Sequence, residues 1–278
     1  MLARTLGIAL CVALAQTPAE AAGKQVRLAY VEWADAVVAT NILKQVLEEK
    51  GFQVKTIPLA AAAMWQAVAT GDADASVAAW LPVTQGAYYE KLKDRLEVVG
   101  PNVTGARIGW AVPTYSPLNS IEDLKTKSAA VGGQVIGIDP GAGVMKSSEA
   151  AIKAYGLPVK LVDGSDATMT SALKDAVRQK KDIVVTAWTP HWMFARYDLK
   201  YLADPKKSFG NDETVNTLAR KGLKEDMPEA YAILKKFKLT TKDEEAVMAQ
   251  NEERGAKPSE TAAKWIANNR ATVDGWLK

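Results

Sequence analysis

The sequence predicts an α/β protein built as two lobes. From residue 26 to residue 188, apolar runs of five to seven residues alternate with amphipathic stretches of helical length. Strands that are separated by such helices pair in parallel, so two parallel-rich sheets flanked by helices are expected. The length of 278 residues exceeds that of one simple core and favours two lobes.

The first part of the chain is expected to form three strands and two helices. Gly51 and Gly71 end the two helices, because glycine readily takes the left-handed conformation that closes a helix. The strands are expected at 26–31, 53–59 and 75–80, and the helices at 34–51 and 61–71.

The second part repeats this alternation and then becomes helical. Strands are expected at 108–113, 135–139 and 182–188, and helices from 121, over 142–156 and over 168–181, with 160–165 leading into the last of these. From Met227 onward the chain is expected to be helical, and Ser259 is a favourable start for one of its helices.

Two segments are expected to cross between the lobes, 100–113 and 203–222. The second is the longest polar, turn-rich stretch after the first 21 residues. These crossings assign 22–107 and 212–278 to lobe one and 108–211 to lobe two, joined by a two-strand hinge. Ligands of α/β sheets bind at the carboxyl ends of strands, so the cleft between the lobes is the expected site.

The N-terminus is interpreted as a secretory signal peptide, residues 1–21. Arg4 supplies the positive charge, residues 6–15 form the apolar core, and Ala19–Ala21 matches the small-x-small cleavage pattern. An uncleaved anchor helix is the weaker alternative, because the apolar run is short. The single cysteine, Cys11, lies inside this segment, so the mature chain has no thiolate and no disulfide.

Composition excludes several classes of function. The net charge is +3 and the charges are interspersed, which argues against a nucleic-acid partner. One histidine and no mature cysteine leave no multi-histidine metal site and no cysteine nucleophile, and there is no G-x-S-x-G motif. We therefore expect no catalytic residue, no metal and no cofactor, although a catalytic pair of carboxylates is not excluded by the sequence.

Three tryptophans are expected at the C-terminal ends of strands: Trp33, Trp80 and Trp188. Packing is the alternative for any one of them. Together they are interpreted as an aromatic cage that faces one cleft, with Trp192 as the packing partner beneath Trp188. Such a cage suits a quaternary ammonium group, whose charge is spread over methyl groups and is attracted by the negative faces of aromatic rings.

The segment IDPGAGVM, residues 138–145, is interpreted as a strand, a glycine turn and a helix start. The backbone N–H groups of Gly143 and Val144 would then face outward at the positive end of a helix dipole, which is a site for an anion. An ordinary strand-to-helix turn is the alternative. Cage and anion site together suit a small zwitterion with a cationic head and a carboxylate tail.

The segments VIGIDPGAG, TAWTPHWMF, YDLKYLADPKKSFG, TLARKG and AAWLPVT together resemble the glycine betaine-binding proteins of ABC importers, over nearly the whole mature chain. The resemblance implies a type II periplasmic-binding-protein fold that closes on its ligand. It implies that Trp33, Trp80 and Trp188 form the cage and that the amides of Gly143 and Val144 hold the ligand carboxylate. The implied partner is a permease with its ATPase, and we expect a monomer.

Three further residues are candidates for the site. Gln85 stands where betaine-specific members of this family have a histidine, and it is expected near the ligand carboxylate. Asp35 has the spacing from Trp33 at which choline-binding relatives carry a carboxylate for the ligand hydroxyl. Those relatives also have a tyrosine at the place of Ile108. His191, the only histidine, is expected either to reach the cleft or to make a structural hydrogen bond.

The expected function is binding of glycine betaine in the periplasm and its delivery to an ABC permease. A choline-, carnitine- or proline betaine-binding protein of the same transporter type is the alternative. Two other classes of function are alternative hypotheses for the same pocket. One is a secreted enzyme that acts on a quaternary ammonium compound, and the other is the ligand sensor of a signalling receptor.

Overall fold

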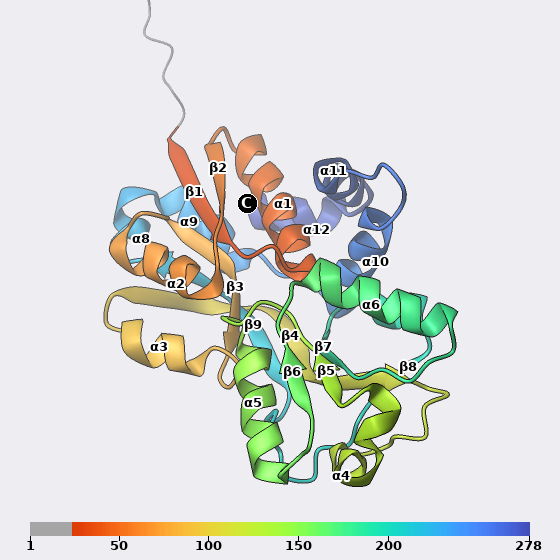
Figure 1. Ribbon diagram of the computed structural model, residues 1–278. Helices are drawn as coiled ribbons and strands as arrows, with labels where there is room; N and C mark the ends of the chain where they lie inside the picture. The colour runs from red at the N-terminus through yellow and green to blue at the C-terminus, as the bar shows by residue number, and fades with distance from the viewer. Residues whose placement is uncertain (1–23) are drawn as a thin grey trace, which may run out of the picture.

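The computed structural model describes residues 24–278, and the signal peptide expected at 1–21 lies outside the described residues. The strands join in the order β2-β1-β3-β9-β4-β7-β5-β6, with β8 paired with β4. Helices flank the strands, as Figure 1 shows. The α/β class predicted from the sequence is confirmed.

The strands have the following bounds: β1 Gln25–Tyr30, β2 Gln53–Pro58, β3 Ala75–Leu81, β4 Leu96–Pro113, β5 Gln134–Ile136, β6 Lys160–Val162, β7 Val185–Thr189, β8 Leu199–Tyr201 and β9 Glu213–Arg220. The helices are α1 Ala34–Glu49, α2 Ala61–Thr70, α3 Gly86–Leu92, α4 Leu124–Lys127, α5 Gly143–Tyr155, α6 Asp166–Arg178, α7 Met193–Arg196, α8 Leu223–Asp226, α9 Pro228–Lys236, α10 Thr241–Asn251, α11 Pro258–Asn268 and α12 Arg270–Leu277. Two 3-10 turns, Ile121–Asp123 and Ser128–Val131, flank α4.

The long strand β4 belongs to two sheets. Its first part, Leu96–Ala106, pairs antiparallel with β9. Its last part, Arg107–Pro113, pairs antiparallel with β7 and β8. We call β2, β1, β3 and β9 with the start of β4 the first sheet, and β7, β5, β6 and β8 with the end of β4 the second sheet. The change of partner falls between Ala106 and Arg107.

Parallel pairing occurs where the sequence alternates strand and helix. Strand β1 pairs in parallel with β2 and β3, and β5 pairs in parallel with β6 and β7. The antiparallel pairs all involve β4 or β9, so each sheet is mixed, with its parallel pairs on the side away from β4. Helix α1 packs along the first sheet through Ile42, Leu43 and Val46, which are completely buried.

Strand β9 is the main element that the sequence analysis did not predict. Its residues lie inside the polar segment 203–222, which was interpreted only as a crossing. The strand lies between β3 and β4, and Val215, Leu218 and Ala219 are buried. Its buried polar side chains find partners in the neighbouring strands, since Asn216 Nδ2 donates to the carbonyl of Ala79 at 3.3 Å. The polar composition of this segment is therefore the reason why the central strand β9 was not predicted.

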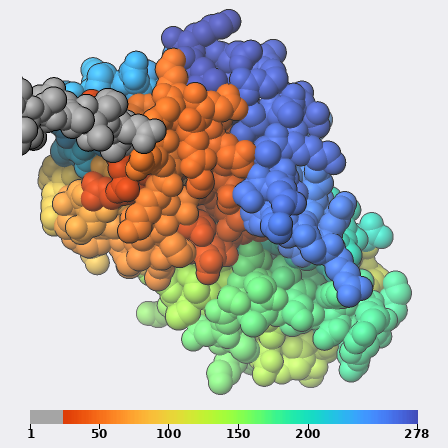
Figure 2. Space-filling model, turned by 90° about the horizontal axis from the view of Figure 1, so that it is seen from above, coloured from red at the N-terminus to blue at the C-terminus, as the bar shows by residue number. Residues whose placement is uncertain are grey.

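The C-terminal helices pack against the beginning of the chain. Helix α1 contacts both α10 and α11. Figure 2 shows this arrangement from above, with the blue C-terminal helices directly beside the orange N-terminal segment and the green region of α5 and α6 at the other end. Trp265 and Trp276 stack with ring centroids 6.0 Å apart, and both are core residues. Within residues 24–278, every helix is too short or too polar to cross a membrane.

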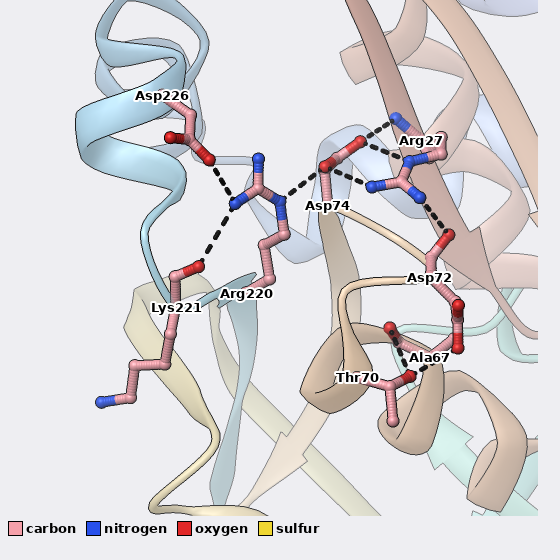
Figure 3. A network of polar contacts seen from close by, with 8 residues as sticks. All are labelled: Arg27, Ala67, Thr70, Asp72, Asp74, Arg220, Lys221 and Asp226. Carbon is pink, nitrogen blue, oxygen red and sulfur yellow. Dashed lines mark hydrogen bonds and ion pairs between the residues drawn. The ribbon is translucent and has the colours of Figure 1, made fainter.

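An ion-pair network ties the first sheet together at the end of its strands that is remote from Trp80. Asp74 is 1% exposed and accepts hydrogen bonds from the guanidinium groups of Arg27 and Arg220 at 2.7–2.9 Å (Figure 3). Arg220 also donates to Asp226 at 2.7 Å. Burial alone would raise the pKa of Asp74, but the hydrogen bonds from the two arginines outweigh it and lower the pKa.

Candidate functional site

A small apolar cavity lies where the two sheets meet. It includes the three tryptophans and the two helix-start residues that the sequence analysis selected. The complete lining is Trp33, Trp80, Thr84, Ile108, Ile138, Ala142, Gly143, Val144 and Trp188. None of these nine side chains titrates near neutral pH.

Each tryptophan of the cavity is carried by a different strand or strand end. Trp33 follows β1 and caps the N-terminus of α1. Trp80 is the penultimate residue of β3 and pairs with Val215 of β9. Trp188 lies near the end of β7 and pairs with Ile108 of β4. The structure therefore brings together three indoles that are distant in sequence, at one junction of the two sheets.

The start of α5 forms part of the cavity wall. Gly143 and Val144 occupy the first two positions of this helix. N–H groups at these positions have no intrahelical acceptor, and the helix dipole makes them favourable donors to an anion. A Cβ atom at Gly143 would lie 2.1 Å from the carbonyl oxygen of Thr84, so this position requires glycine.

Thr84 and Glu213 are site components that the sequence analysis missed. The backbone N–H groups of Val83 and Thr84 donate to Glu213 Oε2 at 2.7 and 2.8 Å, and the Thr84 hydroxyl donates to Oε1 of the same carboxylate. Glu213 begins β9 and is buried. Thr84 precedes Gln85, a selected residue, but Glu213 is 129 residues away and had no local signal.

Gln85 is placed behind the cavity wall and is not one of the residues that line it. Its side-chain oxygen accepts from Trp65 Nε1 at 2.9 Å and from the backbone N–H of Trp80 at 3.1 Å. The side chain is completely buried, and within residues 24–278 its Nε2 has no hydrogen-bond partner. In this arrangement Gln85 supports Trp80, although the sequence analysis expected it near the ligand carboxylate.

Asp35 does not line the cavity but contacts the indole N–H group of Trp188. Its Oδ1 accepts from Trp188 Nε1 at 3.1 Å, and the residue is 2% exposed. Burial raises the pKa of Asp35 to about 6. His191 lowers this pKa, and the neighbouring Asp166 carboxylate raises it further. The carboxylate is therefore engaged with the cage indole, whereas the sequence analysis considered it as a partner for a ligand hydroxyl.

His191 makes structural hydrogen bonds and does not line the cavity. Its Nδ1 accepts from the backbone N–H of Met193 at 3.1 Å, so Nε2 carries the proton and donates to Asp166 Oδ1 at 3.1 Å. The imidazole packs edge-on against Trp188 with ring centroids 4.5 Å apart, and it also packs against Trp192 with ring centroids 5.4 Å apart. Trp192 thus supports the cage through His191.

Behind Asp35 lies a second buried carboxyl group, Glu244 of α10. It is 2% exposed, and its Oε2 has no hydrogen-bond partner among residues 24–278. Burial raises the pKa of Glu244 well above its usual value, and the charge of Asp35 raises it further, followed by those of Asp243 and Glu245 on the same helix. The fold therefore favours the protonated form of this side chain.

We expect Glu244→Gln to stabilise the protein at pH 7–8. A carboxyl group whose pKa is raised by folding contributes its full stability below its unfolded pKa and loses it as the pH rises through the folded pKa. Glutamine has no such loss, so the thermal midpoint of the variant should exceed that of the wild type at pH 8 by about 2–4 °C for each kcal/mol gained. The difference should vanish near pH 4.

The matched control for this prediction is Glu253→Gln, which removes an exposed carboxylate close to the end of the same helix. Its midpoint should follow that of the wild type at every pH. Equal midpoints for Glu244→Gln and the wild type from pH 4 to pH 8 would show that the Glu244 carboxylate is not destabilising.

Among the residues that the structure describes, no three histidine, cysteine, aspartate or glutamate side chains are grouped so that they could hold a metal ion. The polar interactions around the cavity are hydrogen bonds that side chains make with the backbone and with one another. The arrangement has an aromatic wall for a cationic group and a helix N-terminus for an anionic group.

A mixed α/β fold with an apolar cavity where its two sheets meet is typical of a protein that binds a small ligand. Residues 24–268 match the family model OpuAC, described as the substrate-binding domain of ABC-type glycine betaine transport systems. The chain belongs to this family, which consists of transport proteins and is not an enzyme family.

Solved structures and a curated protein support this membership. Lactococcal OpuAC, in a closed-liganded conformation complexed with glycine betaine, is 47% identical, with a TM-score of 0.88 over 92% of this chain and 100% of that chain. The glycine/betaine/L-proline-binding protein ProX of Borrelia burgdorferi is 35% identical, with a TM-score of 0.89 over 92% and 97%. The glycine betaine/carnitine transport binding protein GbuC of Listeria monocytogenes is 45% identical over 166 residues, 59% of this chain and 54% of the length of GbuC.

Proposed function

We propose that the protein binds glycine betaine outside the cytoplasm and delivers it to the permease of an ABC importer. The observation that carries this proposal is the cavity of three indoles beside the N-terminus of α5, in a chain that is 47% identical to a structure complexed with glycine betaine. The trimethylammonium group would lie between Trp33, Trp80 and Trp188. The carboxylate would accept from the N–H groups of Gly143 and Val144.

The magnitudes are consistent with micromolar binding. A desolvated contact between a cation and an aromatic face is worth about 2 kcal/mol, so three such contacts supply about 6 kcal/mol. A micromolar ligand requires about 8 kcal/mol. The remainder would come from the carboxylate at the start of α5, where N–H donors and the helix dipole coincide.

The proposed binding motion is closure of two lobes, 22–107 with 212–278 and 108–211. The support is the change of β4 from β9 to β7 between Ala106 and Arg107, together with β9, whose residues 213–220 return to the first sheet. Trp33 and Trp80 then belong to lobe one, and Trp188 and the start of α5 to lobe two. A ligand that contacts both lobes favours the closed state by differential affinity.

Choline is the alternative ligand within this transporter type, and carnitine and proline betaine are further ones. The position of Asp35 favours a carboxylate-bearing ligand over choline. Its carboxylate accepts from Trp188 and lies outside the lining, so it is not presented to a ligand hydroxyl. An enzyme is disfavoured because the nine lining side chains include no general acid or base.

The protein is proposed to act in the periplasm, after removal of the signal peptide 1–21, as a monomer that docks on a permease with its ATPase. Neither nucleic acid nor a cofactor is part of the proposed function. A signalling role would use the same cavity, and it would be distinguished by co-purification with a receptor in place of a permease.

The test is calorimetric titration of residues 22–278 with glycine betaine and, separately, with choline. We expect glycine betaine to bind with a micromolar or lower Kd and choline to bind at least tenfold more weakly. Tight binding of choline with weak binding of glycine betaine would contradict the proposal.

Gly143→Ala should weaken glycine betaine binding by at least tenfold, about 1.4 kcal/mol. The added methyl group meets the Thr84 carbonyl, which is part of a loop held by Glu213 and cannot yield easily. The start of α5 must then move away from the cavity. The measurement is the same titration.

The matched control is Gly141→Ala in the same turn. A Cβ atom at Gly141 meets no heavy atom within 4 Å, so this variant should bind glycine betaine as the wild type does. Wild-type affinity for Gly143→Ala would show that the position of α5 relative to Thr84 is unimportant for binding.

A further inference from the structure

Three consecutive residues at the start of α1 hydrogen-bond to elements of the second sheet. Trp33 Nε1 donates to Asp139 Oδ1 at 2.8 Å. The backbone N–H of Ala34 donates to Asp166 Oδ2 at 3.0 Å. Asp35 Oδ1 accepts from Trp188 Nε1 at 3.1 Å. This short segment, which follows β1, is thus bonded to β5–α5, α6 and β7.

Two of these bonds form a reciprocal pair. Trp33 comes from the first sheet and donates to an aspartate that follows β5 of the second sheet. Trp188 comes from the second sheet and donates to an aspartate of α1, which packs on the first sheet. Each of these two cavity indoles therefore has its N–H edge held by a carboxylate from across the junction of the sheets.

The two aspartates contact the indoles from outside the cavity, since neither Asp35 nor Asp139 lines it. A hydrogen bond from an indole N–H to a carboxylate is charge-assisted and directional, so it fixes the rotation of the ring about its side-chain torsions. The face of the ring, which meets the cation, stays free. The aspartates thus orient the indoles without occupying the space of a ligand.

Burial increases the free-energy cost of breaking these hydrogen bonds. Asp35 is 2% exposed, whereas Asp139 is partly buried, with its Oδ2 atom buried and without a hydrogen-bond partner in the described part of the chain. A buried carboxylate that loses its donor costs free energy, whereas in a separated arrangement water would solvate the same group. The junction of the sheets is therefore favourable for these carboxylates only when the indole N–H groups are present.

We propose that Asp35 and Asp139 are latch residues, positioning residues that couple closure of the two lobes to the orientation of the cage indoles Trp188 and Trp33. The proposal rests on the proposed function, because it assigns a role in assembling the same ligand site. When the lobes separate, both indole–aspartate bonds break and two walls of the cage lose their fixed orientation. When the lobes close, both bonds and the cage form in one step.

The first test is the kinetics of glycine betaine binding to Asp139→Asn, measured by stopped-flow tryptophan fluorescence. The latch exists only in the closed complex, so dissociation should become about tenfold faster, equivalent to about 1.4 kcal/mol, while association stays within twofold of the wild type. Asp35→Asn should behave in the same way. A dissociation rate within twofold of the wild type for both variants would overturn the proposal.

The control variant is Asp163→Asn, which removes an exposed carboxylate that follows β6 in the second sheet. It should leave both rate constants unchanged. A purely structural role of Asp139 predicts a lower thermal midpoint of the ligand-free protein with no selective effect on dissociation. The combination of an unchanged midpoint and faster dissociation is specific to the latch.

The second test observes the indole N–H groups directly by NMR. In the wild type, hydrogen exchange of the Trp33 and Trp188 indole protons should slow when glycine betaine is added. Asp139→Asn should remove most of the protection of Trp33 and retain that of Trp188, and Asp35→Asn should do the reverse. Unchanged protection of the corresponding indole in both variants would contradict the latches.

Failure of the latches is distinguishable from failure of the proposed function. If the wild type binds choline and not glycine betaine, the ligand assignment is wrong and both latch tests are repeated with choline. If the wild type binds neither compound, the proposed function is wrong. The latches, which form only in the closed complex, are then overturned with it, whereas ligand binding by the wild type with unchanged dissociation from both variants overturns the latches alone.

Discussion

Trp188→Ala is expected to lower the affinity for glycine betaine by more than tenfold. The substitution removes one aromatic wall, worth about 2 kcal/mol when desolvated. It also leaves Asp35, which is 2% exposed, without the indole N–H that it accepts at 3.1 Å. Because both losses fall on the closed complex, calorimetry should show a larger effect here than for any other single substitution in the cavity.

The other two cage residues should behave similarly but to a smaller extent. Trp33→Ala and Trp80→Ala should each weaken binding by about tenfold, or about 1.4 kcal/mol. Trp188→Phe is the graded variant, because it retains an aromatic face and removes the N–H donor, and its affinity should lie between those of the wild type and Trp188→Ala. Normal binding by any two of the three alanine variants would mean that the cage is wrongly placed.

Asp74→Ala is expected to cause the largest loss of stability. It removes the carboxylate that lies between Arg27 and Arg220 and leaves two guanidinium groups facing each other at the edge of the core. Removing one partner of a buried ion pair costs about 3–5 kcal/mol. Urea denaturation should show this loss at pH 7, and glycine betaine binding by the folded fraction should be unchanged, because the network lies at the other end of the strands.

The pH dependence of this effect follows from the lowered pKa of Asp74. A carboxyl group whose pKa is depressed by folding contributes stability above its unfolded pKa, and the contribution is lost as the pH falls through the folded pKa. The difference between the wild type and Asp74→Ala should therefore be constant from pH 5 to pH 8 and shrink below about pH 4. A constant difference down to pH 2 would contradict the ion-pair explanation.

The control is Asp72→Ala, two residues earlier in the same turn. Its carboxylate is exposed and accepts from the Thr70 hydroxyl, whereas Arg27 contacts only its backbone carbonyl. Exposed substitutions of this kind change stability by less than about 0.5 kcal/mol. A loss for Asp72→Ala as large as that for Asp74→Ala would assign the effect to the turn and not to the buried charge.

Local periodicity determined most of the secondary structure. Strands β1, β2 and β3 and helices α1 and α2 lie within two residues of their predicted bounds, because their apolar residues follow the period of a strand or a helix and Gly51 and Gly71 have the positive φ that ends a helix. The polar strand β9 escaped prediction, because its buried Asn216 and Thr217 are compatible with a core only when neighbouring strands satisfy them.

The sequence also determined five of the nine residues that line the cavity. Trp33, Trp80 and Trp188 end or follow apolar runs, and Gly143 and Val144 start a helix, so their backbone positions place them at one edge of the sheets. For Gln85, Asp35 and His191, only the tertiary structure decided which atoms they meet. A polar side chain at the same edge can point into the cavity or behind it, and the choice depends on donors and acceptors elsewhere in the chain.

Those donors and acceptors are far apart in sequence. This is the physical reason why the sequence predicts the position of a residue along the chain but not its hydrogen-bond partner. The bond between Trp188 and Asp35 spans 153 residues, and that between Trp33 and Asp139 spans 106. Residue type and local period determine whether a segment is a strand, a helix or a turn. The pairing of buried polar atoms is determined only when the two sheets pack, because each buried carboxylate then takes whichever donor the fold brings within hydrogen-bond distance.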